Sequence, residues 1–517
     1  MAAQRVAVIG GGPGGLFAAR LLARDHADWQ ITVHERLPPS DTFGFGVGLT
    51  RGLLRNLARA DRAVHDDLVA AERDFSSALF RLPAGDVELP ASHAGGISRA
   101  RLLALLLERA REAGVTIEMG EAPSLGALSE QADLVIAADG VSSLTRAQLV
   151  SELGATEDLG RGFFIWCAAP LALDGTIFLP VRTADGTFVA HAYPYAEGLS
   201  TFVIETDAAT LERAGCRSEH FESDGDSDEA SLRYLSEAFA ELCGGRQLIG
   251  NRSRWMNFRT VRCARWYAGN VVVLGDAAAT AHPSIGSGTK LAMEAAIALT
   301  QSMRSLDGEA PAARLGDFDA GLRPSVERLQ DRARRSQLWW ESFPKRLDLQ
   351  PARIALAYMS RAGAVSLDRF AEAAPVLARQ AAADFAGVDI QEVPAAGLAD
   401  WVAQRRFRAN GIELPGRILE ASSDPGLTDV VVDFDDPWGA AAATRLAEVR
   451  AFAAGGHEAV RLTGGDSRGA LLDRLALGER IRSELGVAVA VSSPREHLGD
   501  AIDGLVAGRT DLIALRN

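Results

Sequence analysis

The pattern that most restricts the fold of this chain lies at residues 5–36, RVAVIGGGPGGLFAARLLARDHADWQITVHER. An apolar stretch meets a glycine-rich turn, an alanine- and leucine-rich stretch follows, and a second apolar stretch ends at Glu35. This order predicts a βαβ unit with parallel strands. Gly10, Gly12 and Gly15 occupy the G-x-G-x-x-G positions, where missing side chains allow a tight turn and a close approach of pyrophosphate to the backbone. The free N–H groups at the start of the helix would hold the phosphates.

Glu35 lies 20 residues after Gly15, about where an acid accepts a hydrogen bond from a ribose hydroxyl. Strand, glycines, helix, strand and acid together predict a Rossmann-like dinucleotide-binding domain. The predicted contacts of this first motif are Gly10, Gly12, Pro13, Gly14, Gly15, Glu35 and Arg36.

Two later stretches have the same form, an apolar strand followed by a polar turn. In ADLVIAADGVSSLTR the turn is Asp139-Gly140, for which an ordinary turn remains the alternative. In VVVLGDAAATAHPSIGSGTKLAME, Asp276 follows the strand, and Gly286 and Gly288 leave the next helix start almost bare. Such a carboxylate can accept from a sugar-like hydroxyl, and such a helix start can stabilise the negative charge of a reduced flavin ring. These contacts lie more than 250 residues after the first glycine turn, so the sequence favours one extended FAD over NAD.

Composition excludes several other classes. The net charge of -14 disfavours nucleic acid as a partner. No signal sequence and no membrane span are evident, so we expect a cytoplasmic protein without a membrane partner. The four cysteines form no paired motif, which argues against a disulfide reductase and against a zinc site, and we expect no metal.

The rest of the chain divides by pattern. Residues 161–259 contain short runs rich in β-branched and aromatic residues, typical of an antiparallel sheet that covers a substrate pocket. FAD-binding segments are expected at 1–160 and 260–320, helices at 321–390 and a linker at 391–416. Residues 417–517 alternate between strand and helix, which predicts a parallel sheet or barrel. The fold class is therefore α/β.

The three motifs, in this order, resemble those of single-component aromatic flavoprotein monooxygenases of the p-hydroxybenzoate hydroxylase type, and the resemblance covers about residues 1–390. In GGISRARLLALLLERA, Arg99 stands where that family contacts the FAD phosphates. DTFGFGVGLT and HPSIGSGTKLAME narrow the resemblance to the branch with salicylyl-CoA 5-hydroxylase and 2-aminobenzoyl-CoA monooxygenase, although Pro283 stands where that branch has an aromatic residue. The last 100 residues resemble the closing part of an old-yellow-enzyme-like (β/α)8 barrel, with only about four strands.

The resemblance implies that NAD(P)H, expected to be NADH, reduces FAD, and that oxygen then forms a C4a-hydroperoxide that hydroxylates an electron-rich ring. Its branch implies an aromatic acyl-CoA substrate, with salicylyl-CoA converted to gentisyl-CoA. A tryptophan or indole hydroxylase and a non-catalytic flavin-binding protein remain alternatives. The absence of a W-x-W-x-I-P segment argues against a flavin halogenase. A homodimer is a further expectation.

Candidate residues near the ring follow from these motifs. His282, His191 and Tyr193 are the candidates for catalysis, and for each an ordinary structural role is the alternative. Phe43 and Phe45 are expected to form a wall beside the flavin. Arg334 and Arg335 lie in a basic helical stretch that could bind coenzyme A phosphates or could be a solvated face. The other predicted contacts are Gly46, Val47, Gly275 and Asp276 for the cofactor and Pro283 for the substrate.

Overall fold

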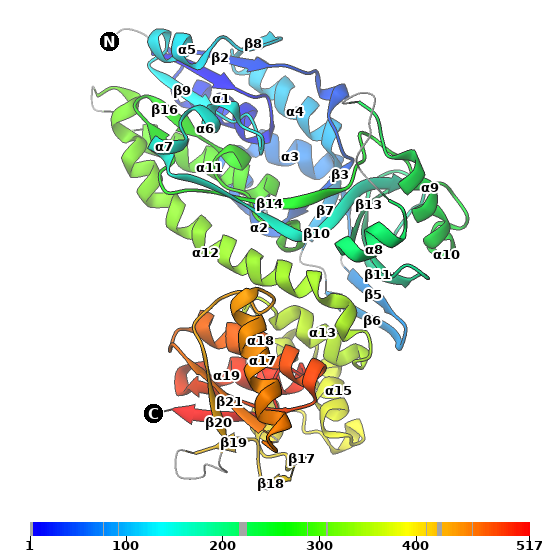
Figure 1. The fold of residues 1–517 in the computed structure, drawn as a ribbon. Coiled ribbons are helices and arrows are strands. Elements are labelled where there is room, and N and C mark those ends of the chain that lie inside the picture. Colours follow the sequence, from blue (N-terminus) through cyan, green and yellow to red (C-terminus); the bar gives the residue numbers. More distant parts are fainter. Residues whose placement is uncertain are drawn as a thin grey trace. The chain divides into compact units, whose positions relative to one another are not determined.

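The computed structural model of the chain describes residues 4–75, 77–90, 93–216, 225–286, 288–304, 306, 309–409, 411–420, 427–457 and 459–516. It forms two compact units (Figure 1). The first comprises Met1–Leu79 and Ala91–Gln337, and the second comprises Phe80–Pro90 and Leu338–Asn517. The division therefore falls at 337/338, ahead of the linker that the sequence places at 391–416.

The first unit contains the predicted Rossmann-like sheet. Its strand order is β15-β16-β9-β1-β2-β8, and all neighbours are parallel except β15 and β16. The middle strands consist of apolar residues buried on both faces, as a parallel sheet between helices requires. The strands are β1 (Arg5–Ile9), β2 (Gln30–Glu35), β8 (Thr116–Met119), β9 (Leu134–Ala137), β15 (Tyr267–Ala268) and β16 (Val271–Val273).

Three helices carry the predicted cofactor contacts: α1 (Pro13–Asp25), α4 (Arg99–Glu112) and α11 (Gly288–Met303). Helix α1 packs against both α4 and α11. The contact with α11 is close because both helices have small side chains there. A Cβ on Gly14 would lie 3.3 Å from the Cβ of Ala292. The two glycine-rich helix starts are therefore held in one layer.

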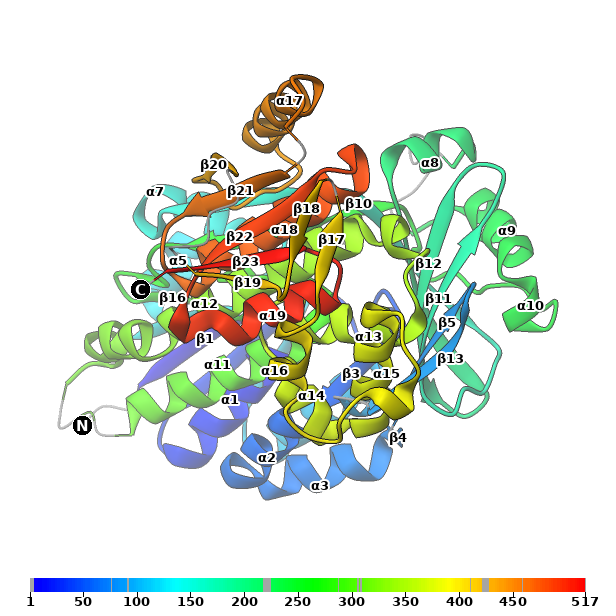
Figure 2. The same ribbon diagram turned by 90° about the horizontal axis from the view of Figure 1, so that it is seen from below.

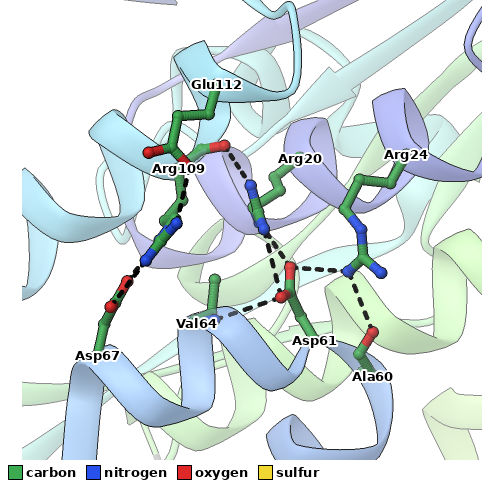
Figure 3. A network of polar contacts seen from close by, with 8 residues as sticks. All are labelled: Arg20, Arg24, Ala60, Asp61, Val64, Asp67, Arg109 and Glu112. Carbon is green, nitrogen blue, oxygen red and sulfur yellow. Dashed lines mark hydrogen bonds and ion pairs between the residues drawn. The ribbon is translucent and has the colours of Figure 1, made fainter. Parts of the chain in front are cut away.

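A buried charge network joins α1 and α4 to the helix α3 (Arg62–Ala71) (Figure 3). Asp61, the N-cap of α3, accepts from the Nε of Arg20 at 2.5 Å and also contacts Arg24 at 2.9 Å. Arg20 donates in addition to the carbonyl of Arg109 on α4, and Arg109 forms an ion pair with Asp67 at 2.5 Å. Burial alone would raise the pKa of Asp61, but hydrogen bonding and the charge of Arg20 outweigh it and hold that pKa below its usual value.

The predicted antiparallel sheet is also present in the first unit, in the order β14-β10-β13-β12-β11. One of its faces buries an apolar core that includes Ile165, Ala190 and Phe202. Beyond β11 lies β5 (Ser77–Leu82), within which the chain passes into the second unit. The strands are β10 (Ala155–Ala169), β11 (Thr176–Arg182), β12 (Thr187–Ala196), β13 (Leu199–Thr206) and β14 (Met256–Cys263).

The second unit contains a parallel sheet in the order β19-β23-β22-β21-β20 (Figure 2). From β20 to β23 each strand pairs with the next along the chain, the arrangement that consecutive βα units produce. The barrel resemblance stays a prediction. The strands are β19 (Ile418–Leu419), β20 (Thr428–Val432), β21 (Ala459–Gly464), β22 (Ala488–Pro494) and β23 (Leu512–Arg516), and the connecting helices are α17 (Ala440–Ala454), α18 (Arg468–Leu485) and α19 (Leu498–Val506).

Aromatic side chains hold the hairpin tip 80–90 in the second unit. Phe80 stacks on Trp340 with ring centroids 6.4 Å apart and meets the edge of Tyr358 at 4.9 Å. Phe80 is fully buried. The chain therefore enters this hairpin from the first unit, and the hairpin's apolar side chains are buried in the second unit.

Candidate functional site

The glycines of the first turn differ in how much space surrounds them. Two of them have no room for a side chain, and one faces open space. Gly10 has φ +102°, and a Cβ on it would lie 2.3 Å from the carbonyl oxygen of Ala138. A Cβ on Gly15 would lie 2.1 Å from the carbonyl oxygen of Gly10. By contrast, no atom lies within 4 Å of a Cβ on Gly12, and no side chain caps the helix that begins at Pro13. The turn therefore leaves room for a phosphate group beside the free N–H groups of α1.

Glu35 is close to this turn, at the end of β2. Its Oε2 accepts from the N–H of Gly11 at 2.5 Å, and its Oε1 accepts from the N–H of Leu37 at 2.8 Å. A Cβ on Gly11 would approach the Glu35 side chain to 2.9 Å. Glu35 thus stabilises the glycine turn through these hydrogen bonds, and its contact with a ribose stays a prediction. Arg36 next to it is exposed.

The second motif is organised by Asp139. Its carboxylate accepts from the hydroxyl of Ser143 at 2.6 Å and from the N–H of Thr145 at 3.1 Å. Gly140 has φ +82°, and no atom lies within 4 Å of a Cβ placed on it. Asp139 therefore fixes the turn, while Gly140 is open on its outer side.

Arg146 connects the second motif to the third and was not among the predicted site residues. The buried guanidinium donates to the carbonyls of Val141 and Ala277, the latter at 3.1 Å. The ADGVSSLTR pattern contains this arginine, but its partner lies 131 positions away. Only the tertiary structure reveals that pairing.

The third motif brings Asp276 close to Arg99. Gly275 makes the turn with φ +61°, and Asp276 follows with an accessible side chain. Surrounding protein atoms nonetheless raise the pKa of Asp276 by desolvation, against the opposing charges of Arg99 and Arg146. Burial lowers the pKa of Arg99, against the charge of Asp276. Two predicted FAD contacts of opposite charge, far apart in sequence, therefore lie in one electrostatic site.

The start of α11 is open at Gly288. Gly286 has φ +61°, and no atom lies within 4 Å of a Cβ on Gly288, where the helix begins. Ser287 lies outside the described residues. This second open helix start lies on the helix that packs against α1.

The loop before β3 (Gly46–Thr50) places aromatic side chains near Arg99. The Arg99 guanidinium lies 4.7 Å from the centroid of Phe43, and its Nε donates to the Thr42 hydroxyl at 2.9 Å. Phe43 is 45% exposed, whereas Phe45 packs on the core of the antiparallel sheet. The two predicted wall residues thus differ: Phe43 can contact a ligand, and Phe45 anchors the loop.

Strand β12 lies against β3, where Gly46 and Val47 are predicted to face the flavin. The Tyr193 hydroxyl donates to the carbonyl of Gly46 at 2.9 Å, and burial raises the pKa of Tyr193 far above its usual value. His191, on the same face of the strand, has its Nε2 3.2 Å from Glu205. Tyr193 therefore has a positioning contact, and His191 has an acidic neighbour that sequence reasoning missed.

His282 is buried at the end of the third motif, with 2% of its surface exposed. Its Nδ1 accepts from the N–H of Ser284 at 3.3 Å and lies 2.8 Å from the Ser284 hydroxyl. That hydroxyl lies 2.6 Å from Ser336 on α12 (Leu315–Glu341). The ring also meets Phe258 edge-on at 4.2 Å. Pro283, next to it, is exposed.

The basic stretch on and after α12 separates into two groups. Arg334 and Arg335 are half-buried on α12 in the first unit. In the second unit, Lys345 forms an ion pair with Glu484 at 2.7 Å, and Arg346 with Glu479 at 2.6 Å. Carboxylates of α18 therefore pair with Lys345 and Arg346, and the phosphate-binding role of Arg334 and Arg335 stays a prediction.

Comparisons with known proteins identify the family and the fold. A family model described as an FAD binding domain matches residues 126–333. A salicyloyl-CoA 5-hydroxylase of Streptomyces sp is 38% identical, covering 69% of this chain and 70% of that protein. A 3-hydroxy-4-methyl-anthranilyl-[aryl-carrier protein] 5-monooxygenase of Streptosporangium sibiricum is 36% identical, covering 70% of this chain and 95% of that protein. The solved structure of 2-methyl-3-hydroxypyridine-5-carboxylic acid oxygenase shares the fold, with a TM-score of 0.52 at 21% identity over 70% of this chain and 96% of that one.

The chain belongs to the FAD-dependent aromatic monooxygenases. FAD is its cofactor, and NAD(P)H is the co-substrate typical of the family. Within the described residues, no group of three or more His, Cys, Asp or Glu side chains could hold a metal ion. The four cysteines are buried and unpaired. No helix in the described part of the chain is long and apolar enough to cross a bilayer.

Proposed function

We propose that this enzyme hydroxylates the ring of an aromatic acid carried as a thioester, with salicylyl-CoA as substrate and gentisyl-CoA as product. One observation carries the proposal: two relatives at 38% and 36% identity are both named for aromatic acyl thioesters, one on coenzyme A and one on a carrier protein. Both names also place the new oxygen at position 5. That carbon is para to the hydroxyl or amino group of the named acid, where such a group makes the ring most nucleophilic.

The open glycine positions fit FAD. Gly12, Gly140 and Gly288 each have no atom within 4 Å of an added Cβ. Gly12 adjoins the uncapped start of α1, and Gly288 is the first residue of α11. We assign the pyrophosphate to Gly12 and Arg99, and the sugar-like chain to Asp276. When bound, FAD supplies electrophilic oxygen at the expense of NAD(P)H, expected to be NADH, and O2.

His282 is proposed to orient the substrate phenol. Because its Nδ1 accepts from a backbone N–H, the neutral ring carries its proton on Nε2. That proton can be donated to the phenol oxygen, so His282 would hold the ring in place. Tyr193 would act at a distance by keeping Gly46 and Val47 against the flavin, and Phe43 would close the pocket against water.

Arg334 and Arg335 are proposed to pair with the phosphates of the thioester's carrier. A phosphate is too polar to bury without partners, and arginine pairs with it in a bidentate fashion. This part of the proposal rests on the charge of the two residues and their place on α12. A homodimer also remains a proposal, to be checked by light scattering.

Substrate-dependent oxidation of NADH and of NADPH tests the function. We expect salicylyl-CoA to stimulate oxidation and to gain one oxygen by mass, while free salicylate stimulates it poorly because most binding contacts are missing. 2-Aminobenzoyl-CoA and the same acids on a carrier protein test the choice of carrier. If free salicylate or a tryptophan derivative is hydroxylated as efficiently as the thioester, the proposal is wrong. If none of these thioesters is hydroxylated, the substrate assignment is wrong.

A further inference from the structure

The turn Gly464-Gly465-Asp466-Ser467, here named the GGDS turn, has no part in the flavin chemistry described above. It belongs to the second unit and connects the carboxyl end of β21 to the start of α18. Loops at the carboxyl ends of parallel strands are where α/β sheets bind ligands. The side chains beneath and beside this turn give it a distinct chemistry.

Two arginines from different elements hold the carbonyl groups of the GGDS turn. Arg474 of α18 donates from Nη1 to the carbonyl of Gly465 at 2.8 Å and from Nε to that of Ser492 at 3.1 Å. Arg516 of β23 donates from Nη2 to the carbonyl of Gly464 at 3.1 Å. In a trans peptide the next N–H points opposite to the carbonyl. The N–H groups of Gly465 and Asp466 therefore point away from the arginines, toward the outer side of the turn.

The start of α18 adds further donors. The Ser467 hydroxyl caps the helix by accepting from the N–H of Ala470 at 3.2 Å. Within the described residues, no acceptor takes the N–H of Asp466, Arg468 or Gly469. The helix is 18 residues long, so its dipole adds positive potential at these groups. A glycine turn followed by free N–H groups is a favourable place for an anion.

Unpaired N–H groups on the two arginines independently suggest that a hydrogen-bond acceptor is missing near the turn. Arg474 is completely buried, yet its Nη2 has no hydrogen-bond partner among the described residues, and neither does the buried Nε of Arg516. Burial and the like charge of Arg516 lower the pKa of Arg474 to about 10, against the charges of Asp466 and Asp473. Leaving buried guanidinium N–H groups unpaired is costly, and a nearby anion would lower that cost.

The exposed carboxylate of Asp466 already pairs with Arg516. Asp466 Oδ1 lies 2.5 Å from Nη2 of Arg516, and the Asp466 side chain is 75% exposed. Asp500 is engaged elsewhere, because it forms an ion pair with Arg468 at 2.6 Å. An incoming anion would therefore compete with a single exposed carboxylate for Arg516, and only a multiply charged group with several acceptor oxygens would have an advantage.

We propose that the GGDS turn, backed by Arg474 and Arg516, is a binding site for a phosphomonoester group in the second unit. The phosphate lies at the start of α18, accepts from the N–H groups of Arg468 and Gly469, and displaces Asp466 from Arg516. Free phosphate, the 3′-phosphate of coenzyme A and the phosphate of a mononucleotide such as FMN share this chemistry. The site is independent of the substrate proposed above.

Calorimetric titration of the FAD-saturated enzyme, at low ionic strength and without phosphate in the buffer, tests the site. Inorganic phosphate is the first probe, and two matched pairs identify the source: coenzyme A against dephospho-coenzyme A, and FMN against riboflavin. Arg516→Gln should weaken phosphate binding about tenfold or more. Asp466→Asn should strengthen it by removing the competitor. Arg450→Gln, an exposed arginine on α17, is the matched control and should change nothing.

The outcomes separate cleanly. Tighter binding in Asp466→Asn together with weaker binding in Arg516→Gln supports the site, and the pair whose phosphorylated member alone binds names the ligand. No binding of any probe at about 10 mM, a concentration that detects even very weak sites, overturns it. Equal affinity in wild type and Arg516→Gln also overturns it. If Arg516→Gln does not fold, Asp466→Asn decides alone, and unchanged affinity in that variant rejects the proposal.

Discussion

At the scale of single residues, the glycines of the first motif divide into those that the fold needs and one that the ligand needs. Gly12→Ala places a methyl group in open space at φ -74°, so we expect the stability of the apoprotein to change by less than about 1 kcal/mol. The same methyl would push pyrophosphate away from the helix start, weakening FAD binding by roughly tenfold or more. Gly15→Ala is the matched contrast, since its Cβ would lie 2.1 Å from a backbone oxygen and should destabilise the fold by about 1–3 kcal/mol. Urea unfolding and flavin fluorescence titration measure the two effects. Equal losses of stability in both variants would contradict this division.

Asp503 provides a pH-dependent prediction at the same scale. Burial raises the pKa of Asp503 to about 8, against the hydrogen bond from the Leu367 N–H and the charge of Arg509, which lower it. The like charges of Asp500 and Asp368 add to the effect of burial. The folded protein therefore keeps a proton that the unfolded chain releases near pH 4. Unfolding releases that proton between about pH 4 and 8, so this group makes stability fall as pH rises through that window and level off above it.

Asp503→Asn should remove this slope, which approaches about 1.4 kcal/mol per pH unit for one proton. The asparagine keeps an acceptor for the Leu367 N–H and cannot ionise, so the variant should be more stable than wild type at pH 8. Urea unfolding monitored between pH 5 and 9, with the exposed Asp158→Asn as control, measures the difference. Parallel pH profiles for wild type and Asp503→Asn would show that the carboxyl ionises normally in the fold.

At the scale of elements, α1, α3 and α4 depend on the buried pair of Arg20 and Asp61 (Figure 3). Asp61→Asn leaves the Arg20 guanidinium buried beside a neutral amide, and breaking such a pair costs about 3–5 kcal/mol. Asp67→Asn is the matched control, because it removes the same charge from the same helix at a partly exposed pair, 23% and 28% accessible. Its cost should stay near or below about 1 kcal/mol. Urea unfolding measures both, and similar costs would mean that burial of the Arg20 pair is not decisive.

At the scale of the whole molecule, FAD should protect the two units unequally. The predicted contacts lie in the first unit, so binding should slow hydrogen exchange at residues 10–16, 139–146 and 275–286. Stabilisation by a ligand grows with its concentration relative to Kd, so protection should rise with added FAD. Exchange in β20 to β23 should change little. Mass spectrometry of the apo and FAD-loaded protein measures this, and equal protection of both units would contradict it.

The sequence predicts motifs whose residues lie close together along the chain. It does not predict contacts between residues that only packing brings together. Gly10, Gly12 and Gly15 could be assigned because strand, turn and helix follow one another within a few residues. The electrostatic meeting of Arg99 and Asp276, and the bond from Arg146 to Ala277, join segments far apart in sequence. Strand alternation predicts the position of His191, but Glu205 beside it lies on the next strand, in a register that no local pattern specifies.

The hairpin tip 80–90 has a consequence for how the protein is made. Its partners Trp340 and Tyr358 are synthesised about 250 residues later, so at ordinary translation rates the tip waits roughly 12 to 50 s for them. During that interval the side chains of Phe80, Leu82, Val87 and Leu89 lack the core that buries them in the finished chain. Removing the second unit by a stop codon near 338 would make this exposure permanent. A shortened enzyme would therefore need the hairpin tip redesigned as well, and the growing chain is an expected client of chaperones that bind apolar segments.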